Sequence, residues 1–190
     1  SAPDGHTLLI VSASQSTQPA LRKLPYDPVK SFTPIAKLAS AFLALVVHPS
    51  VPANSVKELI ALAKRKPGDL TFSGTGTGAH TTMATELFKL MAGIDVVVVE
   101  YKSGGPAVID LLGGHTQAML ATIASVLPQI KAGKLRALGT SGATRSGLLP
   151  DAPTIAEAAV PGFETVQWHG IVAPAGTPAP VIDRLGRELK

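Results

Sequence analysis

The hydrophobic and polar positions of this chain change period several times between residues 46 and 140. Short continuous apolar runs are typical of buried β-strands, whereas apolar residues at every third or fourth position are typical of helices. The strand-like runs are Phe42–Val47, Leu70–Phe72, Val96–Val99, Ala118–Ala121 and Leu135–Thr140. Helical spacing lies between these runs, and this alternation predicts an α/β domain with a mostly parallel sheet and right-handed crossovers.

Polar residues, glycines and prolines indicate where these elements begin and end. Ser55 and Glu58 form a capping-box pattern, which predicts that a helix begins there. Gly93 has the position of a helix C-cap, and Pro106 suits the first position of a helix that runs to residue 112. Val96–Val99 has no polar alternation, so we expect a strand buried on both faces of a parallel sheet.

The two ends of the chain contain fewer regular elements. The pattern predicts a short strand at Thr7–Val11 and a β segment at Ile35–Leu38 that is separate from Phe42–Val47. Further along, Phe163–Val172 predicts a long extended segment, and Val181–Leu189 predicts a final helix.

Composition narrows the classes of protein to which the chain can belong. Hydrophobic residues make up 45% and charged residues 16%, which is the balance of a globular domain. The absence of cysteine excludes disulfide frameworks, cysteine–zinc sites and thiol nucleophiles. The five histidines are not spaced as zinc ligands, so we predict no metal site. No run approaches the roughly 18 apolar residues of a membrane-spanning helix.

Charge and missing motifs exclude several further classes. The net charge is +4, and the one dense basic run, Lys64-Arg65-Lys66, ends a predicted helix, where the helix dipole favours cations. Aromatic residues make up only 4%, which argues against binding of nucleic acid by stacking. The chain has no nucleophile elbow, no phosphate-binding ATPase loop and no dinucleotide fingerprint. We therefore expect neither a nucleic-acid partner nor a cofactor.

The stretch from Leu70 to Met91 carries the clearest chemical signal. It runs from a predicted strand through a loop with Gly74, Gly76 and Gly78 into a predicted helix. The first N–H groups of such a helix point at the loop, and the helix dipole adds about half a positive charge there. A small anion could bind at this place without a basic side chain. A tight strand-to-helix connection with no ligand explains the glycines equally well.

Three loops follow the carboxyl ends of predicted strands, where open α/β sheets bind their ligands. They are Ser73–Ala79, Tyr101–Gly105 and Ala121–Ser125, and all are rich in small and hydroxyl residues and poor in carboxylates. His80 either donates to a ligand from the helix start or is a solvated residue of the first turn. Of Tyr101 and Lys102, we expect one side chain to point into the crevice above the sheet and the other to point away.

Several motifs together resemble one known family. They are Pro3-Asp4-Gly5-His6-Thr7-Leu8-Leu9, Leu24-Pro25-Tyr26-Asp27-Pro28, Ser73-Gly74-x-Gly76-Thr77-x-x-His80, Tyr101-Lys102-x-Gly104-x-Pro106-Ala107, Leu111-Leu112-Gly113-Gly114 and Ala173-Pro174-Ala175-Gly176-Thr177-Pro178. With these motifs the whole chain resembles the periplasmic substrate-binding proteins of tripartite tricarboxylate transporters, the Bug family.

The resemblance implies a two-lobed periplasmic-binding-protein fold of type II, the Venus-flytrap fold, with mostly parallel sheets. Mapped onto this chain, residues 1–44 plus 166–190 would form lobe 1, and residues 45–165 would form lobe 2. Family members usually begin with a further strand, a ligand-contacting loop and a helix. These are missing here together with the C-terminal end, so we expect lobe 1 to be incomplete. The family more often has glycine at the position of Ser103.

The resemblance also implies an extracytoplasmic solute-binding protein and not an enzyme. Such proteins work in the periplasm of Gram-negative bacteria, where they capture a small carboxylate between two lobes and deliver it to membrane permease subunits. A di- or tricarboxylate, an amino acid or an aromatic acid would all fit a pocket of backbone donors. We expect a monomer without a cofactor.

The residues expected to contact the carboxylate are glycines and small or polar residues of the loops. They are Ser12, Ser14, Ser73, Gly74, Thr77, Gly78, Ala79, His80, Tyr101, Ser103, Gly104, Gly105 and Thr122. Backbone N–H groups, hydroxyls and bridging waters would hold the ligand, with Ser12 and Ser14 contributing from the first lobe. Two alternatives remain: an α/β enzyme that acts on a small anion with His80 as general base, and a structural or regulatory interaction domain.

Overall fold

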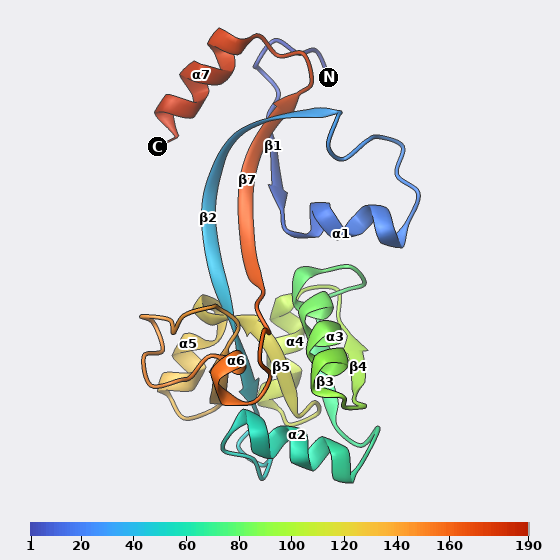
Figure 1. Ribbon diagram of the computed structural model, residues 1–190, viewed down its shortest axis with the longest axis vertical. Coiled ribbons are helices and arrows are strands. Elements are labelled where there is room, and N and C mark those ends of the chain that lie inside the picture. The colour runs from blue at the N-terminus through green and yellow to red at the C-terminus, as the bar shows by residue number, and fades with distance from the viewer. Residues whose placement is uncertain (190) are drawn as a thin grey trace. The chain divides into compact units, whose positions relative to one another are not determined.

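The computed structural model describes residues 1–189 and divides the chain into two compact units. Unit 1 contains residues 1–41 and the residues from 167 onwards, and unit 2 contains Phe42–Val166. Lys190 lies outside the described residues. Figure 1 identifies the elements of both units, and each unit is described by itself below.

Unit 2 consists of strands that alternate with helices. Its elements are the second part of β2 (Phe32–Val47), then α2 (Val56–Arg65), β3 (Thr71–Gly74), α3 (His80–Ala92), β4 (Val97–Glu100), α4 (Gly104–Leu112), β5 (Ala118–Thr122), α5 (Ile123–Lys131), β6 (Arg136–Thr140) and α6 (Ile155–Ala158). The alternation of strand and helix that the sequence predicted over residues 46–140 is confirmed.

The sheet of unit 2 has the strand order β4-β3-β5-β2-β6 and is mixed. β3 is parallel to both of its neighbours, so that Ser73 lies opposite Val99 of β4 and Met119 of β5. β2 is antiparallel to β5 and β6, with Leu45 opposite Leu120. The expectation of a mostly parallel sheet is correct in part: β3, β4, β5 and β6 run in one direction, and β2 runs against them. Strand–helix–strand crossovers set the direction of those four strands but not that of β2.

Two hydrophobic cores lie on opposite faces of this sheet. Leu43 and Leu45 of β2 belong to the core that also contains residues of α2, α3 and α6. Ala44 and Val46, which point to the other face, belong to the core formed with α4 and α5. Successive residues of a strand point to opposite faces, so one apolar strand serves both cores. Helices therefore cover both faces of the sheet (Figure 1).

β4 is the outermost strand of this sheet and is less buried than its sequence predicts. Its only neighbour in the described structure is β3. Val97 is 47% exposed, and Val98 and Val99 are only partly buried. The expectation that the apolar run is buried on both faces was wrong. A continuous run of valines is typical of central parallel strands, but it does not reveal which strand closes the sheet.

Most of the predicted helix ends are confirmed, with two differences. The Ser55 hydroxyl accepts a hydrogen bond from Glu58 N at 3.2 Å, while the Glu58 carboxylate accepts one from Asn54 N, and the pattern is therefore only half a capping box. Gly93 ends α3 with a left-handed φ of 61°. α4 begins at Gly104, two residues before Pro106, instead of at the proline.

Unit 1 contains β1 (Leu9–Ser12), α1 (Ser14–Leu21), the first part of β2, β7 (Val166–Pro174) and α7 (Ala179–Glu188). β7 lies between β1 and β2 and is antiparallel to β1. Only Val11, Ala13 and Ala173 are buried apolar residues among the described residues of this unit. Such a small set cannot form a hydrophobic core of its own.

Two features of unit 1 differ from the sequence prediction. β2 is one continuous strand of 16 residues, not two β segments. The middle residues of β2 are exposed, and hydrogen bonding to β7, not burial of side chains, keeps the strand extended there. The apolar pattern of the sequence therefore did not reveal that the strand continues. The helix α1 was not predicted, because none of its residues is buried and it has no apolar face to recognise.

Candidate functional site

The carboxyl ends of three parallel strands lie at one edge of the sheet of unit 2. β3 ends at Gly74, β4 at Glu100 and β5 at Thr122. Because β3 is parallel to both β4 and β5, the loops that follow these strands leave the sheet at the same edge. The sequence prediction that these three loops follow the carboxyl ends of strands is confirmed. This is the edge at which open α/β sheets bind ligands.

Each of these strands leads into a helix whose first turn has no side-chain cap. The N-cap residues of α3, α4 and α5 are Ala79, Ser103 and Thr122, and none of them accepts a capping hydrogen bond in the described structure. By contrast, Ser55 caps α2 and Thr154 caps α6. The first N–H groups of α3, α4 and α5 thus lack a side-chain acceptor where the helix dipole is positive. Backbone donors at this edge can hold an anion.

The loop between β3 and α3 is held in shape by hydroxyl groups that the sequence analysis did not single out. Thr82 Oγ1 accepts a hydrogen bond from Thr75 N at 3.0 Å, and the hydroxyls of Thr75 and Thr81 are hydrogen-bonded to each other. Gly76 has a φ of 111°, which other residues rarely adopt. The threonines in the first helical turn after the glycine loop were the feature of the sequence that could have predicted these hydrogen bonds. The chain itself therefore sets the shape of this loop.

Ser73 and Gly74, the last residues of β3, are buried beneath this loop. The Ser73 side chain is 1% exposed, and its hydroxyl donates to Ala107 O at 3.2 Å and is 2.6 Å from Thr116 Oγ1. A Cβ at Gly74 would lie 2.9 Å from Thr82 Oγ1, so no side chain fits there. Both residues therefore hold the loop from inside, and neither presents a side chain at the surface of the edge.

His80 is the first residue of α3 and is partly buried. Its Nε2 lies 3.0 Å from Oγ1 of Thr165, with the donor set by the tautomer. Burial lowers the pKa of His80, so the imidazole is neutral at neutral pH. His80 therefore brings a polar group to the start of α3 but no positive charge.

Acid is expected to destabilise the protein through His80. Its pKa in the folded state is below the ordinary value of 6.5, so the unfolded state takes up the proton first as the pH falls. The contribution of His80 to the free energy of unfolding is complete above about pH 6.5 and is lost as the pH falls through the folded pKa. We expect His80→Gln to flatten this dependence in urea denaturation, whereas His115→Gln, at an exposed position, leaves it unchanged. Equal pH dependence in both variants would contradict the assignment.

Tyr101 and Lys102 follow β4 and have different surroundings. The Tyr101 hydroxyl donates to the Asp110 carboxylate, and its ring packs against the core formed with α4 and α5. The hydrogen bond to Asp110 raises the pKa of Tyr101 to about 12, so the phenol stays neutral. Lys102 is exposed. Tyr101 is thus anchored to α4, and its hydroxyl can offer a ligand only an acceptor.

The other predicted contact residues of unit 2 lie in the loops at this edge. Those that are exposed are Thr77, Ser103, Gly104 and Gly105. Thr122 is half-buried, and its hydroxyl donates to Ser125 Oγ at 3.0 Å. Gly78 is buried within the first loop, with a left-handed φ of 79°. The start of α4 and the loop between β3 and α3 are therefore both accessible at this edge of the sheet.

Two carboxylates at this edge were missed by the sequence analysis. Glu100 Oε2 accepts a hydrogen bond from Gly76 N at 2.8 Å, and Asp110 accepts one from the Tyr101 hydroxyl. Glu100 stands immediately before the loop Tyr101–Gly105, so the composition of the loops did not reveal it. Lys102 is the only basic residue in the three loops. The edge therefore offers backbone donors without a surplus of basic side chains.

Ser12 and Ser14, the predicted contact residues of unit 1, flank the junction of β1 and α1. Their hydroxyl oxygens lie 2.8 Å apart and share a hydrogen bond. Ala13 between them is buried, and its N–H donates to Trp168 O at 3.1 Å. The two hydroxyls are thus held side by side on a fixed backbone.

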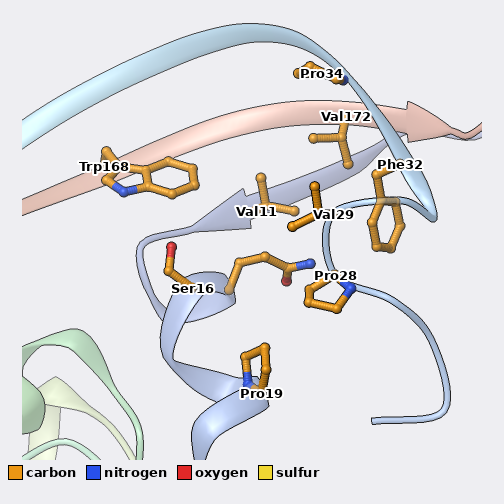
Figure 2. Close-up of a pocket in the computed structure, with 10 residues that line it drawn as sticks. Val11, Ser16, Pro19, Pro28, Val29, Phe32, Pro34, Trp168 and Val172 are labelled. Atoms are coloured by element: carbon orange, nitrogen blue, oxygen red, sulfur yellow. The ribbon is translucent and has the colours of Figure 1, made fainter.

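Unit 1 also contains an apolar hollow of about 450 Å³. Figure 2 shows Val11, Phe32 and Trp168 among the side chains around it. No charged residue lines it, and Nε2 of Gln15 is buried without a hydrogen-bond partner among the described residues. An apolar lining suits an apolar group, and without a charged residue the hollow has no cation to neutralise a carboxylate.

Residues 1–189 contain neither a metal-binding cluster of side chains nor a membrane-spanning helix. Within that range, no group of three or more histidine, aspartate or glutamate side chains could hold a metal ion. No helix described there is both long and apolar enough to cross a membrane.

Comparison with known proteins gives a family match over the whole chain. Residues 1–190 match the family described as "Tripartite tricarboxylate transporter family receptor". Protein BugT of Bordetella pertussis is 36% identical over 192 residues, a match that covers all of this chain and 59% of BugT. The chain therefore spans less than two thirds of the length of this relative.

Two solved structures have the same α/β periplasmic-binding-protein fold. An R. palustris protein solved with adipate has a TM-score of 0.88 and 33% identity, and the match covers 100% of this chain and 64% of that protein. MatC from Rhodopseudomonas palustris, solved with bound malate, has a TM-score of 0.88 and 29% identity, with 100% and 65% covered. The matched family is one of receptors and not of enzymes.

Proposed function

This chain belongs to the tripartite tricarboxylate transporter receptor family, and we propose that it acts as a periplasmic solute-binding protein that delivers a small carboxylate to a membrane permease. The observation that carries this proposal is the meeting of three helix N-termini without side-chain caps at one edge of the sheet. Relatives solved with adipate and malate, both small carboxylates, support it. A receptor needs no general base, so His80 has no catalytic role in this proposal.

The ligand carboxylate would be held mainly by backbone donors of unit 2. We assign this role to the N–H groups of Thr77, Gly104 and Gly105, with hydroxyl contacts from Thr77 and Ser103. The Ala79 N–H donates to Gly76 O at 2.9 Å and the Thr122 hydroxyl donates to Ser125 Oγ, so these two groups shape the edge instead. Neutral donors avoid the cost of burying a lysine. Ser73, Gly74 and Tyr101 would position these groups, and His80 would contribute a neutral polar contact. Ser12 and Ser14 stay predictions.

The two compact units support a two-lobed organisation of type II, the Venus-flytrap fold. In this proposal residues 1–44 plus 166–190 belong to lobe 1, and residues 45–165 belong to lobe 2. The unit boundary after residue 41 and the boundary after Val166 lie close to these limits. The three buried apolar residues of unit 1 support a lobe that is incomplete in this chain. We expect the protein to be a monomer.

The proposed function predicts that small carboxylates stabilise the protein. At about a hundred times its dissociation constant, a ligand adds about 2.7 kcal/mol to the free energy of unfolding and raises the midpoint of thermal unfolding by a few degrees. Adipate, malate, hexanoate and phosphate esters would be compared, with dimethyl adipate as an uncharged control. A shift with a carboxylate alone supports the receptor. A shift with phosphate esters alone, or with none of them, contradicts it.

A further inference from the structure

Glu100 links the end of β4 to the loop between β3 and α3. Its Oε2 accepts a hydrogen bond from Gly76 N at 2.8 Å. The same oxygen and Thr82 Oγ1 lie 3.0 and 2.9 Å from the position that a Cβ of Gly74 would occupy. The carboxylate therefore contacts the base of the loop close to the first turn of α3, and Glu100 is an exposed residue.

This hydrogen bond changes the set of donors that the loop offers to an anion. The N–H of Gly76 belongs to the loop whose next residue, Thr77, is proposed to hold the ligand carboxylate. With Glu100 as its acceptor, this N–H is occupied. The carbonyl of Gly76 accepts from Ala79 N at 2.9 Å, so hydrogen bonds on both sides hold the φ of 111°. A fixed loop loses less conformational freedom when a ligand binds.

The negative charge of Glu100 is not neutralised by a neighbouring side chain. Among residues 1–189, the ion pairs within 4.0 Å join Lys66 to Asp69, Lys89 to Glu86 and Arg145 to Glu157, so Glu100 has none. Lys102, the only basic residue of the three loops, is exposed. The single carboxylate of a monoacid is attracted by the helix N-termini at this edge. A second carboxylate is repelled by Glu100, and no basic side chain offsets this repulsion.

We infer that Glu100 is a positioning residue that fixes the loop between β3 and α3 and makes the site favour a ligand with one carboxylate over a ligand with two. The ligands that fit are monocarboxylates or acids whose second charge is positive. This inference rests on the proposed function, because it concerns the same site.

The test compares adipate with hexanoate, two acids of equal chain length that differ by one carboxylate. Their dissociation constants would be measured by calorimetry for the protein and for Glu100→Gln, Glu100→Ala and Asp95→Asn. Glu100→Gln keeps an acceptor for Gly76 and removes the charge, so we expect adipate to gain about fourfold relative to hexanoate. Glu100→Ala also removes the acceptor, so both acids are expected to bind about tenfold more weakly. Asp95→Asn removes an equal charge just before the start of β4, at the end opposite to Glu100. It should change neither dissociation constant.

A second readout tests the tether without any ligand. The NMR signal of the Gly76 amide is expected to stay near its original position in Glu100→Gln, which keeps an acceptor, and to move in Glu100→Ala, which removes it. An unchanged ratio of the two acids in Glu100→Gln would overturn the inference while leaving the proposed function intact. If neither acid binds, the proposed function and the charge preference both fail, and the Gly76 signal alone decides whether the tether exists.

Discussion

Replacing Ala79 with aspartate is expected to stabilise the protein and to abolish its binding of carboxylates. Ala79 is the N-cap of α3 and already has the extended backbone of a capping residue, with φ −65° and ψ 146°. An aspartate there can accept from the N–H groups of the first turn, which adds about 1 kcal/mol to the free energy of unfolding. The new carboxylate lies beside the loop that is proposed to hold the ligand, so its negative charge repels the ligand carboxylate. We expect the affinity for a carboxylate to fall at least about a hundredfold.

Urea denaturation and calorimetry with the carboxylate that binds best measure the two effects of this substitution. Ala79→Asn is the matched control, because asparagine caps a helix about as well as aspartate but carries no charge. It should stabilise the protein to a similar extent and weaken binding by only about tenfold. An Ala79→Asp variant that is stabilised and still binds with normal affinity would show that the ligand site lies elsewhere.

Replacing Phe88 with alanine is expected to cause the largest loss of stability of the substitutions considered. Phe88 lies in α3, is fully buried, and packs between Phe72 of β3 and Phe163. The ring centroids are 6.4 Å from Phe72 and 5.9 Å from Phe163, the second pair being edge-to-face. Removal of the ring leaves a cavity in the core that attaches α3 to the sheet. We expect the free energy of unfolding to fall by about 3–5 kcal/mol.

Leu90→Ala gives a control on the same helix for this loss of stability. Leu90 is 79% exposed, so its truncation removes no core contact and should change the free energy of unfolding by less than about 0.5 kcal/mol. Both values come from urea denaturation monitored by circular dichroism. A loss below about 1 kcal/mol for Phe88→Ala would contradict the packing of the three rings.

The sequence by itself determined those features that depend on neighbouring residues in the chain. The periods of apolar residues identified the strands and helices of unit 2, because burial of one face imposes period 2 or 3.6 on a local segment. Gly93 and Ser55 marked helix ends through backbone conformation and side-chain capping, which are also local. The three loops at strand ends were located in the same way, and the backbone donors of the candidate site come from them.

Only the tertiary structure decided features that depend on which segments become neighbours. β2 is one strand because β7 pairs with its exposed middle, and β4 is half-exposed because it closes the sheet. In the site, the Ser73 hydroxyl is occupied by Ala107 and Thr116, and Glu100 accepts from a residue 24 positions earlier. Such contacts join residues far apart in sequence, and no local pattern encodes them. The local pattern thus determined which backbone groups could meet a ligand, and long-range pairing and burial decided which side chains support them.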